Sequence, residues 1–158
     1  MQKLAGITVL EYKNGALANE IRRKLHAAEQ SVVITCAPSL GALCGERPEL
    51  LVVAPDFALS DLRPLTRTGC GILLISGDAD ASFFESNCFV TYGMSPKNTL
   101  TASSISGGRL VVSLQREIVT VTGTVLERQE LVTASNVSTE LQLAATGAVL
   151  LLGLFREV

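Results

Sequence analysis

The sequence predicts a single α/β domain over residues 1–158, built as a mostly parallel, doubly wound sheet with a small antiparallel meander before a C-terminal helix. Three observations predict this fold. The first half alternates continuous apolar runs with a helical pattern, as in parallel sheets covered on both faces. The second half carries Val-, Thr- and Ser-rich segments in which apolar and polar residues alternate. The chain then closes on a strongly apolar stretch.

The parallel part of the sheet is expected from five short runs and one amphipathic helix. The runs are residues 7–10, 31–36, 50–54, 71–76 and 88–92. After an Asn-Gly turn, Leu17, Ile21, Leu25 and Ala28 recur at helical spacing and predict one apolar helix face, with Glu20 and Lys24 paired on the outer face. Pro55-Asp56 ends the third run, and a short helix through Leu62 and Leu65 is expected to follow it.

The second half is expected to form the meander and the closing helix. Residues 101–105, 109–115 and 117–126 predict three strands, joined by turns at Gly107-Gly108 and at residues 115–117. Ser135-Asn136 or Ser138 supplies the N-cap of the last helix. Because residues 141–155 are fewer than the ~20 needed to cross a bilayer and include polar positions, they predict a buried core helix and no membrane attachment.

Composition narrows the class of protein further. A hydrophobic content of 47% with 18% charged residues indicates a folded core. A net charge of −2 without a concentrated basic face argues against nucleic acid as a partner.

The cysteines are expected to be unpaired. Cys36 and Cys88 lie in apolar runs and are expected to pack there as free thiols, and neither a metal site nor a disulfide framework is expected. No export signal is recognised, so a cytoplasmic location is expected.

Four segments, in their order along the chain, carry a resemblance to a known family. They are residues 6–17, with Asn14-Gly15 between strand and helix; 52–61 (Val-Val-Ala-Pro-Asp-Phe-Ala-Leu-Ser-Asp); 74–93, with Ile-Ser-Gly-Asp-Ala-Asp and Val-Thr-Tyr-Gly; and 135–145, where Ser-Asn-Val precedes an Ala-rich helix. Together they resemble the central ATPase domain of the Mur ligase family. These bacterial enzymes add amino acids to the UDP-muramyl precursor of peptidoglycan, so the resemblance implies a phosphate loop at the first segment.

Departures from the family pattern remove the groups on which the ATP chemistry depends. Ala16 stands where the resemblance places the phosphate-binding Lys, and Leu17 stands at the position of the Mg²⁺-binding hydroxyl. Tyr12 replaces a glycine, Glu11 adds negative charge, and Phe57 replaces a histidine. Since phosphoryl transfer relies on positioning and electrostatic stabilisation, these losses predict a degenerate loop without catalytic residues, metal or cofactor.

Several interpretations remain open at this stage. Asn14, Gly15, Asp78, Asp80 and Asn136 are candidate vestigial nucleotide contacts, whereas Asp56, Asp61, Asp78 and Asp80 are also ordinary capping and turn residues at strand ends. The first functional hypothesis is a non-catalytic domain that binds another protein or a second copy of itself. The alternative is the ATP- and Mg²⁺-binding module of a split amide-bond-forming ligase. A third is a small-molecule-binding α/β domain outside the family.

Overall fold

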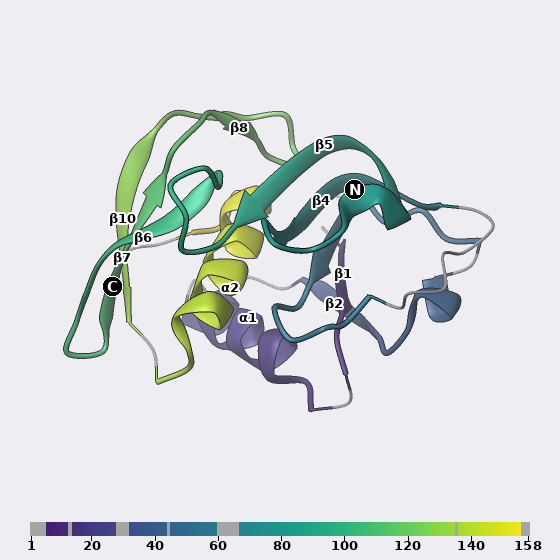
Figure 1. Ribbon diagram of the computed structural model, residues 1–158, viewed down its shortest axis with the longest axis horizontal. Coiled ribbons are helices and arrows are strands. Elements are labelled where there is room, and N and C mark those ends of the chain that lie inside the picture. The colour runs from purple at the N-terminus through teal and green to yellow at the C-terminus, as the bar shows by residue number, and fades with distance from the viewer. Residues whose placement is uncertain are drawn as a thin grey trace.

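A mixed β-sheet with two α-helices on one face forms the body of the molecule (Figure 1). The computed structural model describes residues 6–12, 14–27, 32–43, 45–59, 67–134 and 136–155. The elements in chain order are β1 (Gly6–Leu10), α1 (Ala16–Ala27), β2 (Val33–Ala37), the 3-10 helix η1 (Leu40–Leu43), β3 (Leu50–Val53), β4 (Thr68–Ser76), the 3-10 helix η2 (Ala81–Phe83), β5 (Phe84–Tyr92), β6 (Leu100–Ser106), β7 (Arg109–Leu114), β8 (Ile118–Val119), β9 (Val125–Leu126), β10 (Gln129–Ala134) and α2 (Thr139–Leu151).

Strand order confirms the predicted fold class. In the described part of the chain, eight strands form one sheet in the order β10-β7-β6-β5-β4-β3-β1-β2. All neighbours from β2 to β6 run parallel, whereas β6, β7 and β10 pair antiparallel. The carboxyl ends of the parallel strands therefore share one edge. Because β1 lies between β2 and β3, the direction of winding reverses there, which is where open α/β sheets usually bind ligands.

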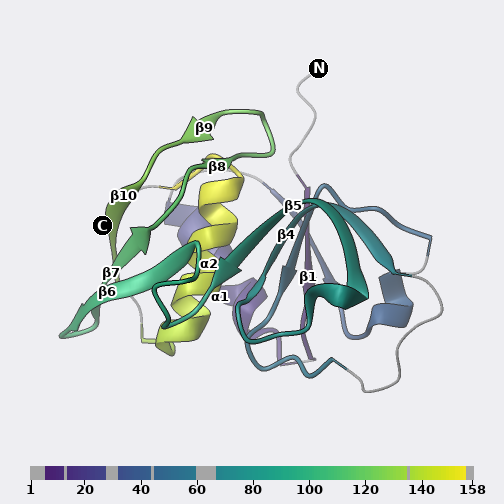
Figure 2. The same cartoon turned by 45° about the horizontal axis from the view of Figure 1, so that its top comes forward.

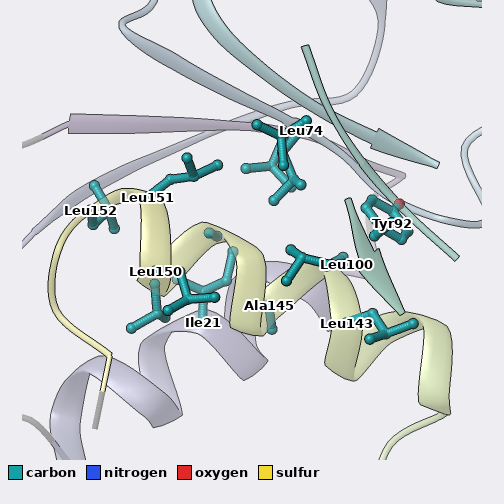
Figure 3. Close-up of a cluster of buried hydrophobic side chains, with 14 of the residues drawn as sticks. Ile21, Leu74, Tyr92, Leu100, Leu143, Ala145, Leu150, Leu151 and Leu152 are labelled. Carbon is teal, nitrogen blue, oxygen red and sulfur yellow. The ribbon is translucent and has the colours of Figure 1, made fainter. Parts of the chain in front are cut away.

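Both α-helices pack on the same face of the sheet. On α1, Leu17, Ile21 and Leu25 are buried, which confirms the predicted apolar face, whereas Ala28 lies outside the described residues. α2 lies between α1 and the strands: Figure 3 shows Leu74 and Leu100 on its sheet side and Ile21 on its α1 side. With neighbours on both sides, α2 has little need of a polar face.

The closing helix is a buried core helix, as predicted. Every residue from 142 to 151 is buried, and Ser138 caps the helix by accepting a hydrogen bond from Leu141 N (3.3 Å). Gly147 allows the close approach to the sheet, because a Cβ at this position would lie only 2.7 Å from Leu100 Cδ1. Among the described helices, none has the length and apolar character needed to cross a bilayer.

The opposite face of the sheet carries a second, smaller apolar cluster. Its members come from the strands β1 to β5 and from the two 3-10 helices, which contribute Leu43 and Phe83. The free thiol of Cys70 is buried here, and burial raises its pKa. Cys36, by contrast, is exposed on β2, so the expectation that it packs as a core residue is wrong. Cys36 is exposed because β2 is an edge strand of the sheet, with a neighbouring strand on one side only.

The antiparallel strands project to one side of the helices (Figure 2). As predicted, Gly107-Gly108 turns β6 into β7, and both glycines have positive φ (56° and 78°). The predicted third strand over residues 117–126 is wrong. This segment folds into the small hairpin of β8 and β9, turned at Gly123 (φ 88°) with Thr124 N donating to Thr120 Oγ1. β10 pairs with β7 instead. The short helix predicted through Leu62 and Leu65 lies outside the described residues.

Candidate functional site

The turn between β1 and α1 is closed by a carboxylate of the chain itself. Glu11 is 3% exposed, and its two oxygens accept hydrogen bonds from Leu17 N (2.9 Å) and Ala18 N (3.1 Å). The first N–H groups of a helix lack partners within the helix and carry partial positive charge, so they form an anion site. Here that site is filled from within. Sequence reasoning placed a negative charge beside the turn but missed this role.

The residues of the turn before α1 take positions that suit folding. Gly15 has φ 64° and donates its N–H to Tyr12 O (3.3 Å), which makes a tight turn. Asn14 is exposed in the same turn. Leu17, at the position of the family's hydroxyl, is fully buried in the core cluster beneath the helices. A magnesium-binding side chain at this position would therefore face an apolar core.

An aromatic pair lies at the reversal of strand order. Tyr12 follows β1 and Phe57 follows β3, and their rings stack with centroids 4.9 Å apart. Tyr12 Oη also accepts a hydrogen bond from Ala58 N (3.0 Å). Nearby, the buried Tyr92 donates to Val53 O (2.6 Å), and burial raises the pKa of its hydroxyl. The hydroxyl of Tyr92 thus bonds to the end of β3, and that of Tyr12 bonds to the segment after it.

The two aspartates after β4 lie in a different part of the edge. Asp80 accepts a hydrogen bond from Ser82 N (2.9 Å) and caps η2, which agrees with the capping interpretation. Asp78 is exposed, and its backbone N–H donates to Ser76 Oγ (3.3 Å). Because β3 lies between β1 and β4, two strand spacings, or about 10 Å, separate this segment from the turn at Asn14. Asp61 lies outside the described residues.

Asn136 lies apart from both groups. It lines a pocket with Arg23 of α1 and with the glycines of the β6–β7 turn. The five candidate contacts thus fall in three places: Asn14 and Gly15 before α1, Asp78 and Asp80 after β4, and Asn136 beside the hairpin. Within the described residues, no group of three or more His, Cys, Asp or Glu side chains is arranged to hold a metal ion.

At the carboxyl edge, the N-terminal N–H groups of α1 thus have an anionic partner in Glu11. Comparisons of the chain with protein-family models, curated proteins and solved structures gave no match. Functional conclusions therefore depend on the geometry of the chain itself.

The polar network of Glu20, Arg23 and Lys24 on α1 is partly buried, whereas Glu20 and Lys24 were expected on the outer face of the helix. Glu20 and Lys24 do form an ion pair (3.8 Å), but their side chains are only 5% and 9% exposed. Lys24 donates to Thr133 Oγ1 on β10, and Arg23 also bonds to Glu20. These bonds bring Thr133 and Ala134, at the end of β10, against this face of α1, a long-range contact that the helix periodicity alone could not reveal. Desolvation lowers the pKa of Lys24 to about 8, although Glu20 opposes the shift.

Lys24→Met is expected to stabilise the fold at neutral pH by roughly 1 to 2 kcal/mol, because it removes a partly desolvated charge. The unfolded chain keeps the Lys24 proton up to pH 10.5, whereas the folded chain releases it near pH 8. Between these values the unfolded state binds more protons, so the wild type gains stability as pH rises. Urea unfolding of both proteins from pH 7 to 10.5 should show their stability difference shrinking. An unchanged difference would mean that Lys24 does not titrate in this window.

Proposed function

We propose that this chain is a non-catalytic domain of Mur-ligase-like architecture that acts by binding another protein or a small ligand and does not use ATP. The observation that carries the proposal is the internal cap: the Glu11 carboxylate occupies the N–H groups of Leu17 and Ala18. In a phosphate loop these helix-end groups would receive the nucleotide. A link to peptidoglycan peptide synthesis in the bacterial cytoplasm is part of the same proposal, and it rests on the resemblance of the sequence.

Electrostatics support the loss of nucleotide binding. A triphosphate approaching α1 would have to displace the buried Glu11 carboxylate or lie against its negative charge. Ala16 offers no ammonium group to offset the phosphate charge, and the buried Leu17 offers no magnesium ligand. The Tyr12–Phe57 stack covers the neighbouring crevice. Each feature acts against ATP independently of the others.

The alternative, the ATP module of a split ligase, requires the surviving polar groups to act together. Asn14 and Gly15 would have to combine with Asp78, Asp80 and Asn136 around one nucleotide. These residues lie in three separate segments, so the geometry favours the non-catalytic proposal. Binding of Mg-ATP to the full chain would favour the split-ligase alternative.

Isothermal titration of the full chain with Mg-ATP is expected to give no heat of binding at millimolar nucleotide. A parallel ¹⁵N NMR titration should leave the amide signals of Leu17 and Ala18 unshifted, because Glu11 holds both groups. Glu11→Gln serves as the matched variant, since it removes the charge and keeps the side-chain length. Micromolar binding to the wild type, with shifts at residues 14–18, would overturn the proposal and favour the ATP module.

A further inference from the structure

A second polar site lies between the middle of α1 and the turn of the β6–β7 hairpin. It is an open pocket of about 440 Å³, lined among others by Glu20, Arg23, Gly107, Gly108, Ala134 and Asn136. Pockets of a few hundred Å³ are of the size that receives small molecules. The pocket is separate from the predicted nucleotide site, and of the five candidate contacts only Asn136 lines it.

Arg23 is held in place at the wall of this pocket. Its Nη2 donates to Glu20 Oε1 (2.6 Å) and to Ala134 O (2.8 Å), and its Nε donates to Glu20 Oε1 (3.2 Å). These bonds join α1 to the end of β10 and fix the plane of the guanidinium group. Within the described residues, Nη1 makes no hydrogen bond, and the side chain remains 52% exposed. The two N–H groups of Nη1 on the fixed Arg23 guanidinium are therefore available to a ligand.

The surroundings of Arg23 favour an anion. Glu20 and Arg23 both line the pocket and carry opposite charges. Lys24 does not line the pocket but also pairs with Glu20, so the group of three side chains carries a net charge of +1 when Lys24 is protonated. The exposed Asn136 adds a side-chain amide donor to the pocket. Gly107 and Gly108 bring no side chain to the opposite wall, and a Cβ on either would meet nothing within 4 Å. The entrance is thus unobstructed on the hairpin side.

We propose that this pocket binds the carboxylate or phosphate group of a small anionic ligand, through Nη1 of Arg23 and the side-chain amide of Asn136. The inference rests on the proposed binding function, and it names the class of ligand. Guanidinium groups held in a fixed plane are suited to planar and tetrahedral oxyanions alike. The volume of about 440 Å³ leaves room for more than an inorganic ion, so the anionic group is expected to belong to a larger organic molecule.

The test is a ¹⁵N NMR titration of the full chain with sodium phosphate in one arm and with succinate in the other. We expect a Kd of about 1 mM for the better probe, as befits one or two polar contacts. The shifts should be confined to the amides of Gly107 and Gly108 and to the backbone and side chain of Asn136. The arm that binds tighter identifies the chemistry of the natural ligand.

Arg23→Gln should weaken binding at least tenfold. Arg22→Gln is the matched control, because Arg22 is the adjacent residue on α1 and bonds only to Asn19 Oδ1 (3.1 Å). Since Arg23→Gln also removes links to Glu20 and Ala134, its fold is checked by the dispersion of the NMR spectrum. Asn136→Ala, at an exposed position, should weaken binding severalfold without disturbing the fold.

Equal binding by Arg23→Gln, Asn136→Ala and the wild type, or shifts spread over the surface, would overturn the inference. These results leave the proposed function intact as long as Mg-ATP does not bind. Conversely, Mg-ATP binding at residues 14–18 overturns the proposed function whatever the result for phosphate and succinate.

Discussion

Glu11→Ala is expected to lower the free energy of unfolding by about 3 kcal/mol, because two charge-assisted hydrogen bonds are lost and two helix-end donors are left unpaired. The bonds in question run from Leu17 N and Ala18 N to the 3% exposed carboxylate. The substitution also opens a small cavity under the turn. Urea unfolding followed by circular dichroism at pH 7 measures the change.

Glu11→Gln is the control for charge, since it keeps one oxygen acceptor at the same distance from the backbone. It should cost about half as much as Glu11→Ala, because a neutral acceptor makes weaker hydrogen bonds than a carboxylate. A loss below about 0.5 kcal/mol for Glu11→Ala would be within the range of ordinary surface substitutions. That result would contradict the internal cap and would leave the helix end available for phosphate.

Gly77→Ala is expected to cost about 2 to 3 kcal/mol through overpacking. Gly77 follows β4, and a Cβ at this position would lie 2.0 Å from Asn98 Oδ1. Asn98 has little room to move away from the added methyl group, because it is only 6% exposed and its Nδ2 donates to Ser95 O (3.0 Å). On its other side lies Gly93, where a Cβ would be 2.7 Å from Nδ2. Thermal and urea unfolding measure the loss.

A double-mutant cycle separates this clash from other effects of the added methyl group. In an Asn98→Ala background, Gly77→Ala should cost less than about 1 kcal/mol, which gives a coupling energy near 2 kcal/mol. Gly41→Ala is the matched control, because a Cβ there makes only an ordinary contact with Ser39 Oγ at 3.8 Å and φ is not positive. An equal loss of stability for Gly77→Ala in both backgrounds would contradict a clash between the added Cβ and Asn98.

The two predictions concern one property of the carboxyl edge of the sheet. Open α/β sheets usually keep a crevice at this edge for a ligand. In this chain, Glu11 fills the end of α1, Tyr12 and Phe57 stack across the reversal of strand order, and Asn98 fits between two glycines. Side chains of the protein thus occupy this edge at three places. The pocket beside Arg23 lies elsewhere, which supports a binding role that does not depend on ATP.

Local sequence patterns were sufficient for the elements that depend on local chemistry. The apolar runs at β1 and β3 predicted buried parallel strands, because burial on both faces leaves no position for polar residues. The same prediction is wrong for β2 and β5, which have exposed residues such as Cys36 and Phe89. The periodicity of Leu17, Ile21 and Leu25 predicted the inner face of α1. Gly107-Gly108 predicted the hairpin turn, since both positions require positive φ.

What the sequence determined by itself was therefore the fold class, the apolar face of α1 and the hairpin turn between β6 and β7. Tertiary structure decided the rest: that β10 and not residues 117–126 completes the antiparallel sheet, that Glu20 and Lys24 are buried with Lys24 bonded to the end of β10, and that Glu11 caps α1. The physical reason is the range of the interactions. A turn or an apolar face depends on a few adjacent residues, whereas burial of a charge depends on which distant strand packs against it.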